Sequence, residues 1–534
     1  MIFRISHTYR LIAVSISLIV LIGIVFGQCL HFDFVRLDDA ENIMQQSEVT
    51  SGISVKGTVW ALTHTQVFRW SPLTTLSRQL DCQMFGLYAG MHHLTNLLIH
   101  ASTTVLLFLV MESMTGGLFP SALVAAIFAI HPLHVEPVAW LSARGELLSS
   151  FFAILTLGSY FRYTRDPTSR TRYGAVVLLF LLSILCKQSL VTLPFILLLL
   201  DYWPLQRMNS KAKGRDLLLE KVPLLLIAII GSIAALLAQH GMTDCWGEAL
   251  PMLTRIGNGI VFLCYYLWKT TVPLGLAFYY LPVRLGYPIW LICFSFLLLL
   301  SVSFLAIRMR KKTPYFLAGW FWFLIMMLPM IGIIHTGSGA HPDRYDYLPM
   351  VGILIAAVWS SVAWSRSSYL RKRALFITAS AIVATLVLAS RNQASTWKDE
   401  EALWHRYQEC VDKDPGDHKK TGTNFLSNGD LEGALKEFRA ALSLDPENPK
   451  TIILVAQLLS IQGDTKEASD LYRKILVIDP NNAEIHYRLA SLLAQGGNYT
   501  EALSEIKKSV FIKPQNQSYQ KFYQSLKIYT HPSP

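Results

Sequence analysis

The sequence predicts an all-α protein in two parts: a polytopic bundle of membrane-spanning helices, followed by a solenoid of short helical repeats. Of the 534 residues, 52% are hydrophobic and only 16% are charged, whereas soluble domains carry about 25% charged residues. Long apolar runs follow one another through most of the chain, and past residue 391 the composition becomes charged and periodic. We therefore expect a membrane domain at 1–391 and a repeat domain at 392–534.

The apolar runs are each long enough to cross a bilayer as a helix. A further run, 174–203, is too long for one helix and is interrupted near Lys187 and Gln188, so we expect two short spans there. Arg4 and Arg10 precede the first run without a clear small-residue cleavage site, which indicates an uncleaved signal anchor. About eleven spans are expected in all, the other nine lying at about 11–30, 93–111, 118–135, 147–161, 221–239, 286–307, 315–334, 347–364 and 373–390.

Basic residues fix the expected orientation. The net charge of +11 collects in short connections between apolar runs, which is the pattern of cytoplasmic loops rather than of a nucleic-acid-binding face. The cytoplasmic connections are expected at 162–172, 207–215, 308–312 and 366–373. Residues 255–272 are then expected at the outer interface or re-entering the membrane. The extracytoplasmic side would hold 31–92, 131–146, 240–285, 335–346 and everything after about 391.

The C-terminal part contains three aligned segments with a period of 34 residues. Glycines, alanines and prolines recur at this spacing, namely Gly429, Gly463, Gly497, Ala434, Ala468, Ala502, Pro446, Pro480 and Pro514. A glycine at the turn, an alanine at the helix crossing and a proline after the second helix are typical of tetratricopeptide repeats. We expect about three repeats and a capping half-repeat, which bind protein or peptide partners.

Two adjacent aspartates, Asp38 and Asp39, follow the first apolar run closely. Carboxylates are poorly suited to anchoring a chain at lipid head groups, a task that favours lysine and arginine. The pair is either an ordinary solvated loop or an acid/base site held at the membrane face.

The segment from Ser71 to Phe85 predicts a helix in the same outer loop. Ser71 and Pro72 form a good N-cap and first-turn pair. Trp60 and Trp70 nearby suit either a helix at the lipid interface or a plain aromatic belt.

The third predicted span ends in "HPLHVEPVAWLSARGELLSS". His131, His134 and Glu136 suggest metal-ligand spacing, but two prolines break the regular helix that a zinc motif of this kind requires. The alternatives are a hydrogen-bonded loop that shapes a polar cavity and direct contact with substrate. Arg144, placed at the membrane edge, is a further functional candidate because a charge there is costly.

Two further cations lie at the same expected face. Lys187 interrupts an apolar stretch with no acidic neighbour in sequence, and Arg344 lies in an outer loop beside Asp343. Arginine suits bidentate phosphate binding, whereas a snorkelling lysine and a local salt bridge are the simpler interpretations. Together with the aspartates, these cations fit an enzyme that uses a lipid-linked phosphate donor, because a carboxylate can accept a hydroxyl proton and cations can stabilise a phosphate leaving group.

In combination, these segments resemble a known family. The blocks "FVRLDDAENI", "SPLTTLSRQLDCQMFGLYAGMHHLTNLLIHA", "HPLHVEPVAWLSARGELLS", "KQSLVTLPFILLLLDYWPL" and "PDRYDYLP" are similar to those of bacterial GT-C-type membrane glycosyltransferases with C-terminal tetratricopeptide repeats. More distantly, they resemble the eukaryotic transmembrane-and-tetratricopeptide protein O-mannosyltransferases. The resemblance implies that Asp38 and Asp39 are catalytic and that Lys187, Arg344 and Arg144 bind the donor phosphate.

The resemblance also implies the reaction. A hexose, with mannose expected, would pass from a polyprenyl-phosphate carrier to a hydroxyl of an extracytoplasmic protein, at a bacterial inner membrane. No cofactor or metal is expected, since cations can offset the charge of a monophosphate. Two alternatives remain: a non-catalytic membrane-anchored repeat scaffold, and a lipid-linked-sugar polymerase or flippase.

Overall fold

A computed structural model describes residues 6–35, 38–66, 69–209, 214–239, 251–277, 286–333, 342–410, 415–427 and 429–530. The chain divides into two compact units, Met1–Val411 and Asp412–Pro534. Both units are helical, and no named strand occurs within the described ranges. This confirms the predicted all-α class.

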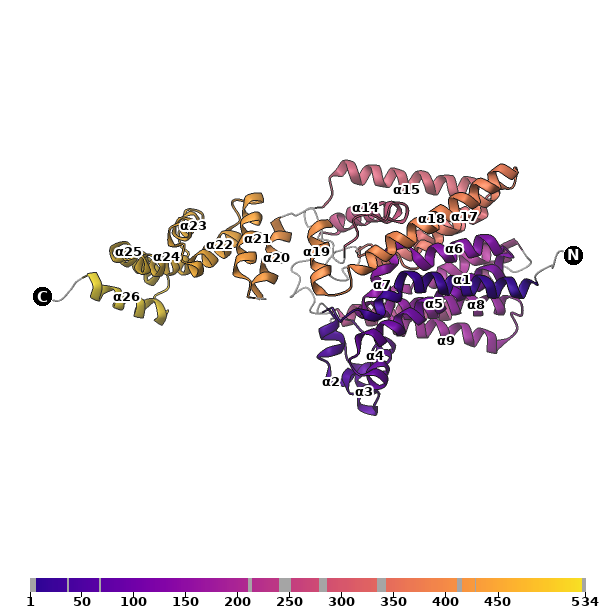
Figure 1. Cartoon of the computed structure of the whole chain (residues 1–534), viewed down its shortest axis with the longest axis horizontal. Helices are drawn as coiled ribbons and strands as arrows, with labels where there is room; N and C mark the ends of the chain where they lie inside the picture. Colours follow the sequence, from indigo (N-terminus) through magenta and orange to yellow (C-terminus); the bar gives the residue numbers. More distant parts are fainter. Residues whose placement is uncertain are drawn as a thin grey trace. The chain divides into compact units, whose positions relative to one another are not determined.

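The first unit is a bundle of helices (Figure 1). Its helices are α1 (His7–Phe26), α2 (Ser47–Thr50), α3 (Val55–Thr63), α4 (Pro72–Phe85), α5 (Ala89–Thr115), α6 (Leu118–Ile130), α7 (Val135–Ala139), α8 (Arg144–Thr164), α9 (Arg170–Cys186), α10 (Leu193–Tyr202), α11 (Gly214–Leu219), α12 (Val222–Ala238), α14 (Met252–Thr271), α15 (Ile289–Met309), α16 (Pro314–Met327), α17 (Met350–Ser365), α18 (Tyr369–Ser395) and α19 (Glu400–Cys410).

Several boundaries follow from local sequence signals. α4 begins at Pro72, as the Ser71-Pro72 pair predicts. α9 ends at Cys186, and a 3₁₀ turn over Gln188–Leu190 separates it from α10, so the predicted break near Lys187 is confirmed.

A main hydrophobic core, with smaller clusters beside it, holds the bundle together. Phe26 on α1 and Phe128 on α6 are buried in it together with Tyr347. Where α16 crosses α17, Gly319 and Gly352 let the two backbones approach closely. A Cβ atom at Gly319 would lie 2.3 Å from the carbonyl oxygen of Gly352. Small residues of this kind are typical of helix packing in membranes.

Five helical segments among the described residues are long and apolar enough to cross a membrane. They are His7–His31, Ala89–Thr115, Gly214–Ala238, Ile289–Met309 and Tyr369–Ser395. The pair Leu118–Ile130 and Pro132–Ala139, bent by 55°, makes a sixth if it is one span. The expected count of about eleven stays a prediction. Parts of the expected outer segments that precede residue 391 lie outside the described residues, namely 36–37, 67–68, 240–250, 278–285 and 335–341.

The expected domain boundary at 391/392 falls inside α18, which continues to Ser395. Just beyond this helix, Trp397 is buried and stacks on Trp140, with 5.7 Å between the ring centroids. This contact ties the segment after residue 391 to the first unit.

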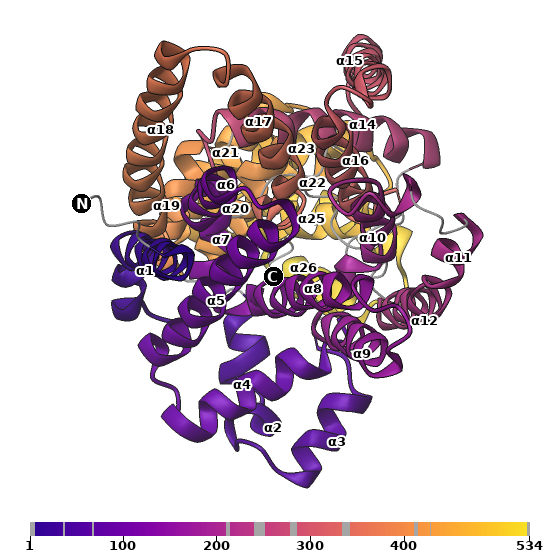
Figure 2. The same cartoon turned by 90° about the vertical axis from the view of Figure 1, so that its right-hand side faces the viewer.

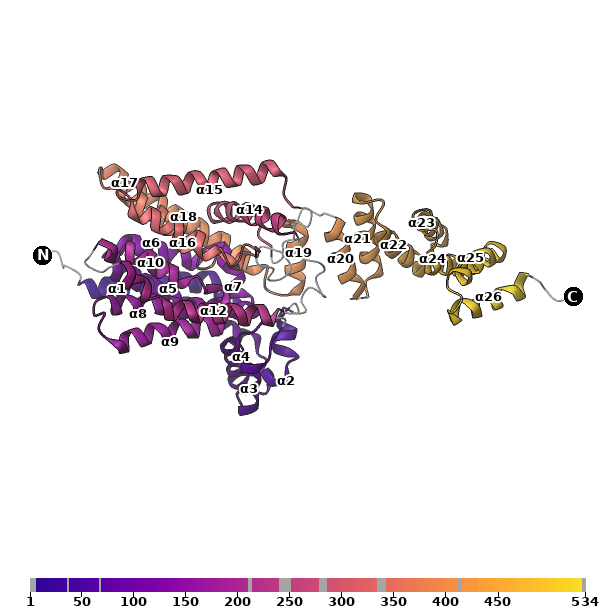
Figure 3. The same ribbon diagram turned by 180° about the vertical axis from the view of Figure 1, so that it is seen from behind.

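The second unit is a row of helix pairs, which Figure 3 follows from α20 to α26. The helices are α20 (Pro415–Ser427), α21 (Leu431–Leu444), α22 (Pro449–Gln462), α23 (Thr465–Ile478), α24 (Ala483–Gln495), α25 (Tyr499–Ile512) and α26 (Gln517–Thr530). Three pairs and one terminal helix agree with the three repeats and half-repeat predicted from the sequence.

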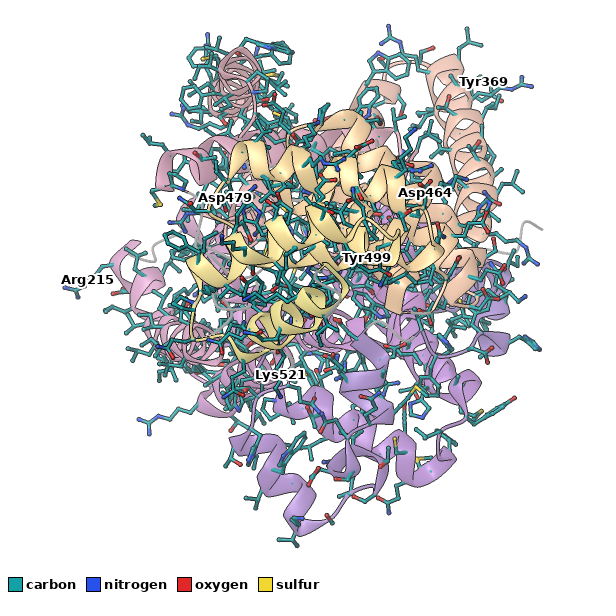
Figure 4. All side chains as sticks on the ribbon, turned by 90° about the vertical axis from the view of Figure 1, so that its left-hand side faces the viewer. Arg215, Tyr369, Asp464, Asp479, Tyr499 and Lys521 are labelled. Atoms are coloured by element: carbon teal, nitrogen blue, oxygen red, sulfur yellow. The ribbon has the colours of Figure 1, made fainter. Side chains whose placement is uncertain are left out.

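The periodic residues have the expected structural roles. The turn glycines Gly429, Gly463 and Gly497 adopt φ values of +81°, +89° and +81°, which favour glycine. Asp464 caps α23 by accepting the backbone N–H of Glu467 at 3.2 Å. Figure 4 labels Asp464 and also Tyr499, the first residue of α25. The periodic alanines Ala434, Ala468 and Ala502 are fully buried.

Candidate active site

A cavity of about 200 Å³ lies in the first unit, where α4, the start of α8, the break after α9 and the end of α12 come together. α12 packs against α9, and α9 against α8, as Figure 2 shows. Four lining residues are cations and one is a carboxylate, so their formal charge is +3. These charged residues are Arg69, Arg78, Lys187, Arg344 and Glu146.

Lys187 reaches this wall because α9 ends one residue earlier and the chain turns. The carbonyl of Cys186 accepts a hydrogen bond of 2.9 Å from the Thr74 hydroxyl of α4, which fixes the break. The Lys187 ammonium forms an ion pair with Glu146 at the start of α8. Lys187 has no acidic neighbour in sequence, and its acidic partner in the fold lies 41 residues away.

Arg344 lies in a 3₁₀ turn over Asp343–Asp346. Its backbone N–H donates to Glu136 Oε2 at 2.8 Å, and its guanidinium forms an ion pair with the other oxygen of Glu136. The Trp140 ring lies 5.0 Å from the guanidinium carbon. Glu136 thus positions Arg344 at the cavity wall. Glu136 itself is not among the described residues that line the cavity.

The two predicted histidines lie behind this wall. His131 accepts the N–H of Leu133 at Nδ1, and its Nε2 lies 3.1 Å from the carbonyl oxygen of Thr270. His134 Nδ1 lies 2.6 Å from the carbonyl oxygen of Phe128. Both rings are buried and bonded to backbone, and the described residues contain no group of three side chains placed to hold a metal ion. The histidines order the segment between α6 and α7.

Arg144 differs from its predicted place. It is fully buried, and its guanidinium donates four hydrogen bonds and forms one ion pair. The partner atoms belong to Asp81 at 2.6 Å, Asn96 at 2.8 Å, His92 at 3.0 Å and Ser77 at 3.1 and 3.3 Å. Arg144 therefore joins α4, α5 and α8, and it is not among the described residues that line the cavity.

Asp39 lies directly behind the cavity wall. It is 1% exposed, and its Oδ1 accepts the backbone N–H of Ser142 at 2.9 Å and the Ser142 hydroxyl at 2.5 Å. Its Oδ2 accepts the N–H of Val35 at 3.2 Å. Burial raises the pKa of this carboxyl from 3.8 to about 6, although the bonds from Ser142 oppose the shift. Ser142 itself lines the cavity.

Asp38 is only half-buried, so the two adjacent aspartates occupy different environments. An ordinary solvated loop does not describe Asp39, because both of its oxygens are bonded inside the protein. Asp39 is connected to the cavity through one hydroxyl group.

Sequence reasoning missed Arg78 and gave Ser142 and Glu146 no role. Arg78 donates from Nη2 to the carbonyl of Ser142 at 2.9 Å. It follows Thr74 by four residues, and both side chains line the cavity. This helical spacing on the predicted helix 72–85 is a signal that could have identified the lining face of α4.

Fold and site together define a helical membrane protein with a cationic cavity and a repeat domain. Two family models, each described as tetratricopeptide repeat, match residues 420–483 and 459–526. They confirm the predicted repeats.

Curated relatives match both parts of the chain. The protein O-mannosyl-transferase F38B6.6 of Caenorhabditis elegans is 24% identical over 456 residues, which are 82% of this chain and 62% of that protein. The protein O-mannosyl-transferase TMTC4 of Mus musculus is 22% identical over 483 residues, 78% of this chain and 64% of that protein. Tmtc1 of Drosophila melanogaster is 32% identical over 145 residues, 26% of this chain and 16% of that protein.

These relatives confirm the resemblance to the transmembrane-and-tetratricopeptide protein O-mannosyl-transferases. The chain spans less than two thirds of the length of each of them. Among solved structures, one chain of the Cut9–Hcn1 hetero-tetramer is similar at 13% sequence identity, with a TM-score of 0.23. The match covers 85% of this chain and 89% of that chain.

Proposed function

We propose that the protein transfers a hexose, with mannose expected, from a polyprenyl-phosphate carrier to a serine or threonine hydroxyl of a protein. The observation that carries the proposal is the cavity, which joins a wall of formal charge +3 to an apolar wall. The names of the curated relatives support the same class of reaction.

The apolar wall suits the lipid part of such a donor. Ala235 and Leu236 of α12 line it together with Val191 and Met330. α12 belongs to a segment apolar enough to cross a membrane, Gly214–Ala238. A donor lying along α12 would keep its chain in lipid and place its phosphate against Lys187 and the arginines.

The cations would act on the leaving group. In the transfer, the bond between the anomeric carbon and the phosphate oxygen breaks, and its electron pair stays on that oxygen. The acceptor oxygen forms the new bond from the opposite face, which inverts the anomeric centre. Fixed cations at the phosphate stabilise the charge that develops, so the proposal requires no metal.

The acceptor hydroxyl loses one proton, and Asp39 is the base that we assign. Because Asp39 lies behind Ser142, the proton would pass through the Ser142 hydroxyl. Ser142 Oγ takes the acceptor's proton and gives its own proton to Asp39 Oδ1. A carboxyl with a pKa of about 6 is ionised at neutral pH and remains basic enough for this task.

We place the chain in a bacterial inner membrane, with the cavity and the repeats on the extracytoplasmic side. The distribution of basic residues between apolar runs supports this orientation. The repeats would bind the acceptor polypeptide, since tetratricopeptide arrays present extended binding surfaces.

Comparative mass spectrometry of extracytoplasmic proteins tests the proposal in cells. Cells with the wild-type chain should carry hexose on serine or threonine of these proteins. Cells that lack the chain, and cells with the Asp39→Asn variant, should lack this hexose. Lys56→Met is the matched control, because Lys56 lies in the same outer segment with its side chain 88% exposed. Unchanged protein hexose in all strains, with altered lipid-linked sugars, would indicate a polymerase or flippase, and no change in either would indicate a scaffold.

A further inference from the structure

We propose that Arg78 binds the phosphate of the donor directly and, through the same guanidinium, sets the position of the Ser142–Asp39 pair. This inference rests on the proposed function and adds a residue that the family resemblance does not assign. Arg78 is 3% exposed on α4 and lines the cavity.

The Arg78 guanidinium has an incomplete set of hydrogen-bond partners. Arg78 Nη2 donates to the Ser142 carbonyl, but Arg78 Nε is buried and has no hydrogen-bond partner. No ion pair of Arg78 with a carboxylate occurs among the described residues. Asp39 attracts it electrostatically, yet both oxygens of Asp39 are already bonded by Ser142 and Val35.

Neighbouring cations show how this protein usually satisfies a buried charge. Arg144, equally buried, donates four hydrogen bonds, one of them from its Nε, and forms an ion pair with Asp81. Lys187 and Arg344 each pair with a glutamate. A buried cation without such a partner is costly, so Arg78 has the arrangement of a group whose counter-charge is a ligand.

A phosphate is the ligand that fits. Guanidinium groups bind phosphate through two parallel N–H groups, and the unpartnered Nε–H supplies one of them. The cavity offers net positive charge on this side and apolar side chains on the other. Since Arg78 also holds the Ser142 carbonyl, the phosphate and the proton-accepting hydroxyl would be aligned by one side chain.

Binding of polyprenyl monophosphate, the sugar-free product, to the full chain in nanodiscs tests this assignment. Neutral polyprenol and inorganic phosphate serve as separate probes for the two halves of the ligand. We expect wild type and Lys56→Met to bind the lipid phosphate equally. Arg78→Met should weaken binding at least about tenfold, because it removes a hydrogen bond to a charged group. Arg78→Lys should weaken binding less.

The outcomes separate the two proposals. If wild type binds the lipid phosphate and both Arg78→Met and Arg78→Lys bind it equally well, the role of Arg78 is overturned and the donor class stays intact. Absence of binding by wild type would overturn both. If Arg78→Met does not fold, Arg78→Lys decides, because it keeps the charge but removes the planar pair of donors. Inorganic phosphate bound as tightly as the lipid would contradict a lipid-linked ligand.

Discussion

The rate of transfer should depend on pH through Asp39. Burial raises the pKa of this carboxyl to about 6, and only the ionised form accepts the proton. At pH 5 about 10% of a group with this pKa is ionised, whereas an aspartate with an ordinary pKa would be about 90% ionised. We therefore expect kcat/KM at pH 5 to be about tenfold below its value at pH 7.5.

The raised pKa of Asp39 affects stability in the opposite direction: activity should rise with pH, whereas stability should fall. A raised pKa means that the folded protein holds the proton more tightly than the unfolded chain, so stability is lost as pH rises from 3.8 to about 6. Above pH 6 the ionised carboxylate costs about 3 kcal/mol. Asp39→Asn removes this cost and loses the bond from Val35 N–H, worth about 1 kcal/mol. The variant should thus be inactive but more stable at pH 7.5.

The assay is initial transfer rate in nanodiscs at limiting donor concentration from pH 5 to 8, combined with thermal unfolding at pH 5 and 7.5. The stability gain of Asp39→Asn should shrink at pH 5, where wild-type Asp39 is mostly protonated. Lys56→Met should reproduce the wild-type profile. A flat rate between pH 5 and 8, or an Asp39→Asn variant that is less stable than wild type at pH 7.5, would refute the assignment.

Three further predictions concern the relay, the buried junction and the orientation. Ser142→Ala should lower turnover by at least about a hundredfold with little change in donor affinity, whereas Ser142→Thr should recover part of it, as measured by kcat and KM. Arg144→Met leaves the buried Asp81 without its arginine partner and should cost about 3 to 5 kcal/mol of stability, as measured by unfolding. An effect on donor affinity alone would contradict a structural role for Arg144. A phosphatase that works only outside the cytoplasm should be active when fused to the C-terminus and inactive when inserted after Asp166; the reverse result would overturn the orientation.

Local sequence signals predicted the boundaries that depend on neighbouring residues. Pro72 marks the start of α4, and the polar pair at Lys187 and Gln188 marks the break between α9 and α10. The 34-residue period predicted the repeats because each repeat places its glycine and alanine at the same turn and crossing. These features require no knowledge of distant contacts.

The pairing of charges could not be predicted in the same way. Glu136 and Arg344 are 208 residues apart in sequence, and Glu146 reaches Lys187 only because α8 packs on α9. Arg144 was expected at the cavity, but its partners on α4 and α5 draw it into the interior. Which carboxylate meets which cation is decided by tertiary packing, so residue type alone identified candidates without their roles.

The most direct test is a reconstituted transfer reaction with purified components. Polyprenyl-phosphate-mannose and an acceptor polypeptide are incubated with the protein in nanodiscs, and both products are followed by mass spectrometry. We predict one hexose gained by the acceptor for each polyprenyl phosphate released, with Asp39→Asn slower by at least about a hundredfold. Sugar that remains on the lipid, or that is added to another lipid-linked sugar instead of the polypeptide, would contradict the proposed function.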